Sequence, residues 1–328
     1  MRDDSSSGAA SGCGSSSDSV SVQRRSGMAR PTFEDNAVGG RPEWLKVRLQ
    51  LNSDFFNVKE LVHKAGLHTV CESASCPNIG ECWSNRTLTF MVLGNICTRS
   101  CGFCDVTTGK PGAVDMDEPR RVAESLATLN LRYAVITSVD RDDLPDGGAA
   151  FWAETIRRTM ELCPTMELEV LVPDFKGHLP DVATVVEARP TVYAHNMETV
   201  ERLHRLVRPQ ARYERSLLTL SYARSLGAVT KSGIMMGLGE TNDEIVQVMQ
   251  DLARAGVEIV SLGQYMRPSP RHLPVARWVR PEEFAELRDE GLRAGLIHVE
   301  AGPLVRSSYH ADAQARAARE NREAMGQS

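Results

Sequence analysis

Short apolar runs alternate with amphipathic stretches along most of this chain. Six of the runs are rich in apolar and β-branched residues and have the length of strands buried on both faces. These predicted strands cover Leu88–Leu93, Tyr133–Thr137, Met166–Val172, Thr191–Ala194, Ser232–Met236 and Val257–Leu262. They place a buried sheet at the centre of the expected fold.

Helical periodicity fills the intervals between these strands. Apolar residues recur at spacings of three and four, and Thr241 stands where it can cap the last helix. The predicted helices cover Asp54–Leu67, ahead of the first strand, and then Arg120–Leu129, Ala149–Leu162, Glu198–Leu206 and Asn242–Ala255. Strand and helix thus alternate about six times, which implies parallel strands joined by right-handed helical crossovers.

Polar residues and glycines gather directly after each predicted strand. The segments are Gly94–Asn95, Ser138–Asp140, Pro173–Asp174, His195–Asn196, Gly237–Glu240 and Gly263–Tyr265. In a β/α barrel the carboxyl ends of the strands form the catalytic mouth. We therefore expect an α/β fold, a partial parallel β/α barrel with six units, in preference to an open doubly wound sheet.

Composition narrows the class of protein. The chain has 328 residues, of which 41% are hydrophobic and 25% charged, enough to bury the core of one barrel-sized domain. A net charge of -5 provides no overall basic field, so we do not expect a nucleic-acid partner. No apolar run approaches the roughly 18 residues of a membrane helix, and no secretory signal pattern is evident. We expect a soluble cytoplasmic protein without a membrane partner.

Residues 1 to 30 differ in composition from the rest of the chain. They are rich in Ser, Gly and Ala and contain few large apolar side chains, so we expect a disordered tail. Asp3, Asp4 and Asp18 argue against an organelle transit peptide, which is usually poor in acidic residues. Met28 remains open as an alternative start of translation, and Cys13 belongs to no recognisable pattern.

Three cysteines stand on one short loop after the first predicted strand: Cys97, Cys101 and Cys104. Three thiolates can hold three corners of a 4Fe–4S cube and leave the fourth iron open to bind another molecule. A three-cysteine zinc site is the alternative, but zinc knots usually contain paired CxxC elements and four closed ligands. The spacing favours the iron–sulfur cluster.

This CxxxCxxC spacing, with Phe103 before the last cysteine, resembles the signature of the radical S-adenosylmethionine (SAM) superfamily. In that superfamily the methionine portion of SAM chelates the open iron, and an electron from the cluster cleaves the sulfonium to a 5'-deoxyadenosyl radical. The segment Gly233–Glu240 resembles the superfamily's GxIxGxxE segment, which lies along the adenine, with Met235 where Ile is usual.

Four polar residues after the second and fourth predicted strands are suited to bind SAM. Ser138, Asp140, Asn196 and Glu198 offer hydroxyl, carboxylate and amide groups for its amine, carboxylate and ribose. The alternative is that they are strand-end caps or turn formers, roles in which such residues are common. His195 is equally well interpreted as a packed barrel residue or as a ligand.

A second cysteine triplet lies upstream at Cys71, Cys76 and Cys82 and implies a second cluster. Together with TFMVLGNICTRSCGFCDV, TSVDRDDLPDGGA, VPDF, HNMETV, KSGIMMGLGET, LGQYMRPS and GPLVRSSYHA, this triplet resembles the lipoyl synthase family from about Arg41 to Ala311. The resemblance implies insertion of two sulfur atoms, at C6 and C8, into an octanoyl chain attached to a lysine of a carrier protein. Sulfur would come from the second, auxiliary 4Fe–4S cluster, which is consumed.

The resemblance also implies a fourth ligand of the auxiliary cluster, Ser308, in the RSSY motif. Without that context an ordinary surface or capping serine would be the better interpretation. Arg306 would place a cation beside the anionic cluster, or else is an exposed surface residue. Cys163, at the end of a predicted helix, is expected to be a small buried hydrophobic residue.

The same resemblance implies a set of partners and, together with the composition of the first 30 residues, a division of the chain. The partners are octanoylated carrier domains (2-oxoacid dehydrogenase E2 subunits and glycine cleavage H protein), reduced ferredoxin or flavodoxin, and iron–sulfur assembly factors. Residues 1–30 form the tail, 31–85 an extension with the auxiliary cysteines, 86–300 the radical SAM partial barrel, and 301–328 a C-terminal segment with the RSSY ligand.

Two other classes compete with this interpretation. A sulfurtransferase resembling biotin synthase would be expected to lack the triplet from Cys71 to Cys82. An electron carrier with two clusters would close each cluster with four ligands and be far shorter. An unactivated methylene C–H bond is beyond any acid or base that a protein can tune, so the expected reaction requires the radical cofactor.

Overall fold

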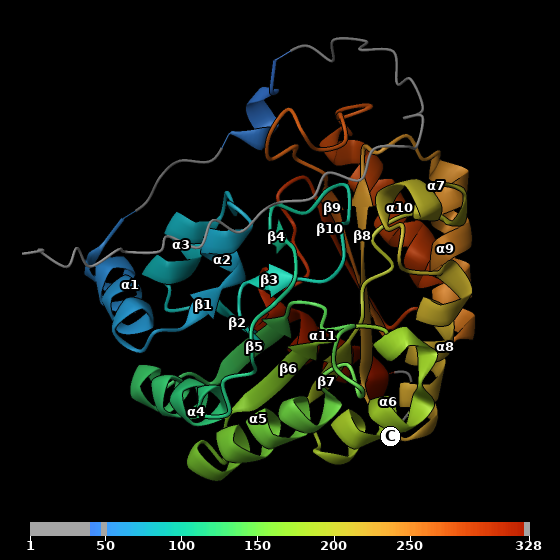
Figure 1. The fold of residues 1–328 in the computed structure, drawn as a ribbon. Helices are drawn as coiled ribbons and strands as arrows, with labels where there is room; N and C mark the ends of the chain where they lie inside the picture. Colours follow the sequence, from blue (N-terminus) through green and yellow to red (C-terminus); the bar gives the residue numbers. More distant parts are fainter. Residues whose placement is uncertain (1–39, 47–50, 325–328) are drawn as a thin grey trace, which may run out of the picture. The chain divides into compact units, whose positions relative to one another are not determined.

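A curved eight-stranded sheet organises the part of the chain that the computed structural model describes, residues 40–46 and 51–324 (Figure 1). The strand order is β1-β2-β5-β6-β7-β8-β9-β10, and only the β1–β2 pair is antiparallel. The strands are β1 (His68–Thr69), β2 (Thr89–Val92), β5 (Tyr133–Ser138), β6 (Glu167–Leu171), β7 (Val192–Ala194), β8 (Thr230–Met236), β9 (Ile259–Gln264) and β10 (His298–Gly302).

All six predicted strands are present, as β2 and β5 to β9. A seventh parallel strand, β10, was not predicted; it pairs with β9, with His298 opposite Ile259. Inward residues of β2, β5, β6, β8 and β9 all line one cavity, so the sheet curves around it. Because β1 and β10 are the free ends of the sheet, the barrel is partial, and the predicted fold class is confirmed.

Helices cover the outer face of the sheet (Figure 1). The longer helices are α1 (Ser53–Lys64), α4 (Glu118–Leu129), α5 (Ala149–Leu162), α6 (Leu179–Glu187), α7 (Glu201–Val207), α8 (Tyr213–Ser225), α9 (Asn242–Arg254), α10 (Pro281–Arg293) and, at one end of the barrel, α11 (Ala311–Ala324). The predicted N-cap is confirmed, because Thr241 and Glu244 form a reciprocal capping box at the start of α9.

One predicted helix begins too early. The sequence places its start at Glu198, whereas α7 begins at Glu201. The backbone at Glu198 extends the parallel ladder instead: its N–H donates to the Gly233 carbonyl (2.9 Å), and its own carbonyl accepts from the N–H of Met235 (2.9 Å). Glu198 adopts a φ of 67°, which turns the chain at the carboxyl end of the sheet and holds its side chain at the cavity.

Helix α11 joins the amino ends of three strands. Arg319 pairs with Glu167 at the start of β6, Arg322 pairs with Glu258 just before β9, and the amide of Asn321 donates to the Ile297 carbonyl (3.0 Å) before β10. The helix therefore closes the end of the barrel opposite the carboxyl ends of the strands. Among the described residues, no helix is both long and apolar enough to cross a bilayer.

The N-terminal region that carries Cys71, Cys76 and Cys82 packs beside β2. Two short helices, α2 (Val70–Ser73) and α3 (Ile79–Ser84), follow β1, and Trp83 of α3 is fully buried in the core. The expected tail, with Cys13 and Met28, lies outside the described residues.

Candidate active site

A cavity of about 570 Å³ lies at the carboxyl ends of the strands. Its walls come from the barrel, from the N-terminal helices α2 and α3, and from the segment between β10 and α11. Every site residue predicted from the sequence lines it: Cys71, Cys76, Cys82, Cys97, Cys101, Phe103, Cys104, Ser138, Asp140, Asn196, Glu198 and Ser308. Residues from opposite ends of the chain therefore share one chamber.

The loop from Cys97 to Cys104 is fixed at both ends and in the middle. Strand β3 (Ile96–Cys97) pairs with β4 (Thr107–Thr108) in a small parallel sheet. Gly102 donates its N–H to the Val207 carbonyl (2.8 Å), and its own carbonyl accepts from the N–H of Leu273 (3.0 Å). A Cβ at Gly102 would come within 2.9 Å of the Leu273 side chain, so any other residue here would displace that leucine.

The sulfur of Cys97 accepts two backbone hydrogen bonds. The backbone N–H groups of Arg99 and Asp140 point to it, at 3.4 and 3.3 Å. Burial, reinforced by the Asp140 carboxylate, raises the pKa of the Cys97 thiol to about 11. Burial likewise raises the pKa of Cys101 to about 12 and of Cys104 to about 11. These thiols are neutral at neutral pH and become thiolates when a metal replaces the proton.

The second triplet spans the two short N-terminal helices, with Cys82 in α3 and Cys76 in the connection between α2 and α3. Cys71 lies in α2, which Thr69 caps by accepting the N–H of Glu72, and the N–H of Cys76 donates to the Cys71 carbonyl (3.0 Å). Burial raises the pKa of Cys71 to about 11 and, with the neighbouring thiols, that of Cys82 to about 12. The chemistry of this set suits a second metal cluster for the same reason as the first.

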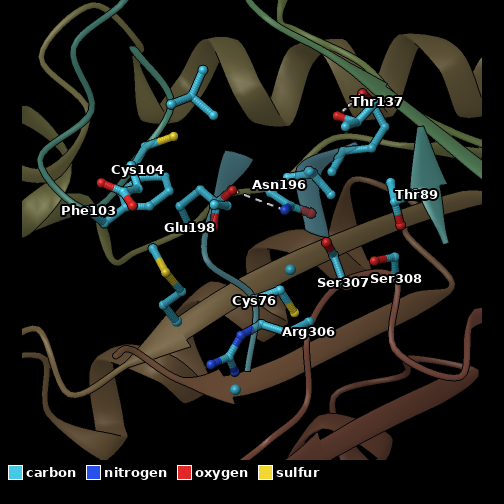
Figure 2. Close-up of a pocket in the computed structure, with 18 of the residues that line it drawn as sticks. Cys76, Thr89, Phe103, Cys104, Thr137, Asn196, Glu198, Arg306, Ser307 and Ser308 are labelled. Carbon is cyan, nitrogen blue, oxygen red and sulfur yellow. Dashed lines mark hydrogen bonds between the residues drawn. The ribbon is translucent and has the colours of Figure 1, made fainter. Parts of the chain in front are cut away.

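The C-terminal segment is tied directly to this second triplet. The side-chain amide of Asn78, which is 1% exposed, donates to the Leu304 carbonyl (2.8 Å), and the Tyr309 hydroxyl donates to Glu81 (3.0 Å). Ser307 and Ser308 consequently line the cavity with Cys76 (Figure 2). Both hydroxyls are at the wall, so geometry alone leaves the assignment between these two serines open.

Arg306 lies on the same wall and lines the cavity rather than the outer surface (Figure 2). Burial lowers the pKa of Arg306, while the neighbouring Cys76 opposes that change. The guanidinium donates to the Val305 carbonyl (2.7 Å). That carbonyl packs closely on β9, since a Cβ at Gly263 would lie 2.0 Å from the carbonyl oxygen. A cation thus stands beside the second triplet, as expected for the partner of an anionic group.

The predicted SAM contacts include two polar atoms without a partner. Within the described residues, Ser138 Oγ and Asn196 Oδ1 are buried and make no hydrogen bond. The other amide atom of Asn196 donates to Glu198 (3.0 Å), and burial raises the pKa of Glu198 (Figure 2). A Cβ at Gly233 would lie 2.9 Å from Asn196 Oδ1, so glycine leaves this acceptor room. These features fit a polar ligand such as SAM.

Two residues singled out by their position have structural roles. His195 is 1% exposed, and its ring nitrogens bond to the Val172 carbonyl (2.8 Å) and the Ser216 hydroxyl (2.9 Å). Burial lowers the pKa of His195 to about 4, so it is a neutral packed residue. Glu240 accepts the N–H groups of Gly237 (2.6 Å) and Leu238 and so closes its own turn; only the beginning of Gly233–Glu240 lines the cavity.

Sequence reasoning missed two cations at the first triplet. Arg208 lines the cavity and donates to the Asn196 carbonyl (2.6 Å), and the buried Arg99 lies within the CxxxCxxC loop itself. Arg208 belongs to no recognised motif, and Arg99 occupies one of the unspecified positions of the CxxxCxxC motif, so only the tertiary structure identifies them. Cys163, expected to be buried, is half-buried at the end of α5.

Similarity to known proteins agrees with this arrangement. The profile of the Radical SAM superfamily matches residues 91–252. A lipoyl synthase of Rubrobacter xylanophilus is 54% identical over 88% of this chain and 91% of its own length. Those of Flavobacterium johnsoniae and a Nocardioides species are each 52% identical, over 85% and 87% of this chain and 98% and 90% of theirs. The chain belongs to the lipoyl synthase family.

Proposed function

We propose that this chain catalyses the lipoyl synthase reaction, the insertion of two sulfur atoms at C6 and C8 of an octanoyl chain attached to a lysine of a carrier protein. One observation carries the proposal: both cysteine triplets and Ser308 line the same cavity. A substrate carbon must lie near the first triplet to lose a hydrogen atom and near the second triplet to receive sulfur. The reaction therefore requires that the same carbon can reach both triplets. A shared chamber meets that requirement.

The first triplet is the proposed site of radical formation. Membership of the radical SAM superfamily implies a 4Fe–4S cluster and SAM, and Cys97, Cys101 and Cys104 would hold that cluster. When bound, the cluster and SAM supply the 5'-deoxyadenosyl radical that removes a hydrogen atom from the methylene group. Phe103, Ser138, Asp140, Asn196 and Glu198 would hold SAM, and two of these residues present buried polar atoms without partners.

The second triplet is the proposed sulfur source. Cys71, Cys76 and Cys82 would hold the auxiliary 4Fe–4S cluster, with Ser308 as the fourth ligand. A serine oxygen is a harder ligand than a thiolate, so the bond to Ser308 would be the one most easily broken when sulfur leaves. Arg306 lies where its positive charge would balance an anionic cluster beside Cys76.

Apolar side chains complete the chamber. Met91 and Leu171 reach it from β2 and β6, and Ile234 and Met235 from β8. An alkyl chain gains free energy by leaving water for such a surface, at about 0.8 kcal/mol per buried methylene. These walls would also exclude water from a radical intermediate.

The proposal extends to partners, compartment and division of the chain. The substrates would be octanoylated carrier domains of 2-oxoacid dehydrogenase E2 subunits and glycine cleavage H protein. Reduced ferredoxin or flavodoxin would supply electrons, and assembly factors would rebuild the auxiliary cluster. Free thiols for two clusters favour a reducing compartment, here the cytoplasm. Residues 31–85 and 301–328 would hold the auxiliary cluster, and 86–300 the radical site.

The direct test is anaerobic incubation of the reconstituted protein with SAM, a strong reductant and a peptide bearing octanoyl-lysine. Mass analysis should find two added sulfur atoms in the peptide, and 5'-deoxyadenosine should accumulate. A peptide with unmodified lysine is the control and should gain none. One added sulfur as the final product, or hydroxylation without sulfur, would assign the chain a different radical reaction.

A further inference from the structure

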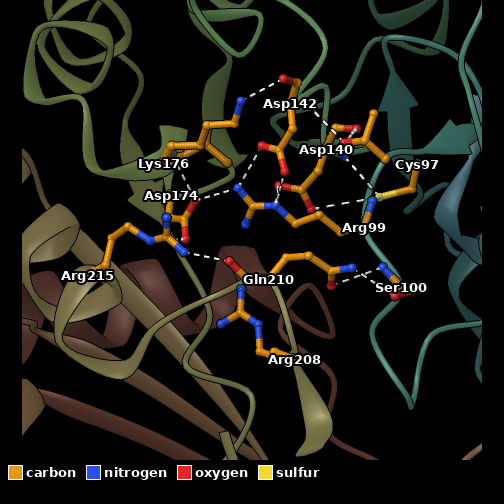
Figure 3. Close-up of polar contacts among 12 residues, drawn as sticks. Cys97, Arg99, Ser100, Asp140, Asp142, Asp174, Lys176, Arg208, Gln210 and Arg215 are labelled. Atoms are coloured by element: carbon orange, nitrogen blue, oxygen red, sulfur yellow. Dashed lines mark hydrogen bonds and ion pairs between the residues drawn. The ribbon is translucent and has the colours of Figure 1, made fainter. Parts of the chain in front are cut away.

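An arginine inside the first cysteine loop is the centre of a buried ionic cluster. Arg99 is 3% exposed and stands between Cys97 and Cys101 in sequence. Its guanidinium forms a two-pronged pair with Asp142, at 2.8 and 2.9 Å, and also donates to Asp174 at 2.7 Å. Figure 3 shows these carboxylates on one side of Arg99 and Cys97 on the other.

A third carboxylate belongs to the same cluster. Asp140 Oδ1 lies 3.3 Å from Arg99 Nε, while the backbone N–H of Asp140 donates to the sulfur of Cys97 (3.3 Å). Asp140 is also one of the residues proposed to contact SAM. A single guanidinium therefore orients a ligand-binding carboxylate and is covalently part of the cysteine loop.

The far side of the cluster is anchored to the barrel wall. Asp174, which is completely buried at the end of β6, receives a second ion pair from Arg215 (2.9 Å), which belongs to α8. Burial opposes ionisation of Asp174, but the surrounding cations, Arg99 first, lower its pKa to about 2, so it is charged at neutral pH. Lys176 adds a hydrogen bond to the Asp142 carbonyl (2.6 Å; Figure 3).

We propose that Arg99 is a positioning residue that holds the Cys97–Cys104 loop and the Asp140 carboxylate in one fixed arrangement relative to the ends of β5 and β6. The inference rests on the proposed function only in assuming that SAM binds beside these cysteines. It gives a role to Asp142 and Asp174, polar residues after two strands that SAM binding leaves unexplained. Arginine suits this position because its planar fork can bind several carboxylates at fixed angles, which lysine cannot.

The chain offers a matched control in Arg141. This arginine is equally buried (3% exposed) and forms the same two-pronged pair, with Asp143 at 2.9 and 2.8 Å. It donates to the carbonyls of Leu93 and Gly112, and among the described residues it forms no hydrogen bond or ion pair with the cysteine loop. Arg99→Lys and Arg141→Lys therefore each remove one buried fork and keep the charge.

The test measures SAM binding and backbone hydrogen exchange on the full-length reconstituted variants. In Arg99→Lys the dissociation constant for SAM should rise about ten-fold, and amides of residues 98–104 should exchange faster, because a loosened loop misplaces both partners. The spectral change of the reduced cluster on adding SAM should weaken in parallel. Arg141→Lys should alter SAM binding by less than about two-fold and leave that segment protected, even if its melting temperature falls equally.

If Arg99→Lys does not fold, Asp142→Asn provides the test, because it keeps a hydrogen-bond acceptor and removes one charge at a partly exposed position. The dissociation constant for SAM and the exchange rate of residues 98–104 should both rise, but less than expected for Arg99→Lys. Unchanged SAM binding and exchange in the Arg99 or Asp142 variant would overturn the proposal. Equal shifts in Arg141→Lys would do so too, since the effect would then be general stability. Neither SAM binding nor hydrogen exchange requires sulfur insertion, so the role of Arg99 can be tested even if the proposed reaction does not occur.

Discussion

The two cysteine triplets occupy one cavity but are held by different kinds of interaction. The loop from Cys97 to Cys104 is fastened by buried ion pairs through Arg99 and by backbone hydrogen bonds at Thr98 and Gly102. The segment from Cys71 to Cys82 is held by single hydrogen bonds of Ser75, Asn78 and Glu81. Two further contacts join His63 to Glu72 and His310 to Glu81, and both histidines are about half-exposed.

This difference matches the roles proposed for the two sites. A cluster that generates radicals repeatedly must keep its geometry, and a buried network that is fully paired provides rigidity. A cluster that gives up sulfur and is rebuilt requires a scaffold that opens at low cost. Separate hydrogen bonds, one between neutral groups and two to carboxylates, are worth roughly 1 to 3 kcal/mol each and supply such a scaffold. The comparison indicates that a loop is held more firmly where its cluster is retained than where its cluster is consumed and rebuilt.

The largest effect is expected at the first triplet. Replacing Cys97, Cys101 or Cys104 with Ala should reduce 5'-deoxyadenosine formation to background, because the electron for SAM cleavage comes from the cluster they hold. High-performance liquid chromatography of the reaction mixture measures the amount of 5'-deoxyadenosine formed. Cys163→Ala, which removes a half-buried cysteine outside the cavity, is the control and should behave like the parent. Continued cleavage in the first set would place radical formation elsewhere.

The next effect separates two adjacent serines. Ser308→Ala should leave the auxiliary cluster labile and bring sulfur insertion to a small fraction of the parent, while 5'-deoxyadenosine still forms. Ser308→Cys should retain the cluster more firmly yet slow insertion, because a thiolate releases iron less readily than a serine oxygen. Ser307→Ala should be milder in iron content and product. The reverse order between Ser307→Ala and Ser308→Ala would move the ligand by one residue.

A smaller effect is expected from the bridge between the two triplets. Ser75 donates a hydrogen bond to Asp105 (2.9 Å), the residue after Cys104. Ser75→Ala should leave 5'-deoxyadenosine formation unchanged but lower the yield of sulfur product per nucleoside a few-fold, since one hydrogen bond contributes about 1 kcal/mol. Ser225→Ala, which removes a comparable exposed bond in α8, should change neither. An unaltered ratio of sulfur product to nucleoside in Ser75→Ala would show that this hydrogen bond does not set the spacing between the two triplets.

The last effect is on stability rather than on activity and concerns the residues just before the first loop. Glu118 is 4% exposed and accepts the N–H of Leu93 (2.8 Å), shortly before the loop begins. Burial raises the pKa of Glu118 to about 6, so its contribution to stability is present below its unfolded pKa and is lost as pH rises through the folded value.

Relative to the parent, Glu118→Gln should therefore gain about 2 kcal/mol in unfolding free energy between acidic and mildly alkaline pH. Denaturant unfolding at a series of pH values measures the difference. Glu124→Gln, at an exposed position of the same helix, should show no such trend. A pH-independent difference for Glu118→Gln would mean that the carboxyl is ionised at no cost.

Six parallel strands and both cysteine triplets could be recognised from the sequence because both signals are local. A run such as Ala134–Ile136 is apolar throughout, and the spacing of three thiols is visible without tertiary structure. Strand β10 was missed because His298 and Glu300 interrupt its apolar pattern, and only Val299 of the strand is buried. Helix α11 was missed because its sequence is strongly polar and its role depends on pairs with distant strands.

The ionic cluster could not be predicted for a related reason. The partners of Arg99 are 43 and 75 positions away in sequence, and nothing in the local pattern distinguishes this arginine from a surface residue. Asp140 was identified as a SAM contact from its place after a strand, but its ion pair with Arg99 is a product of the fold. Sequence reveals candidate ligands, and the tertiary structure reveals what orients them.

The central claim, that the two triplets have separate roles, is tested most directly by replacing Cys71, Cys76 and Cys82 together with Ala. Iron content, 5'-deoxyadenosine and sulfur product should be measured on the same folded sample. The account predicts about four irons per chain in place of about eight, since one 4Fe–4S cluster remains. It further predicts nucleoside formation close to that of the parent and no sulfur in the peptide. Loss of SAM cleavage from a protein that is still folded, or sulfur insertion without these cysteines, would contradict it.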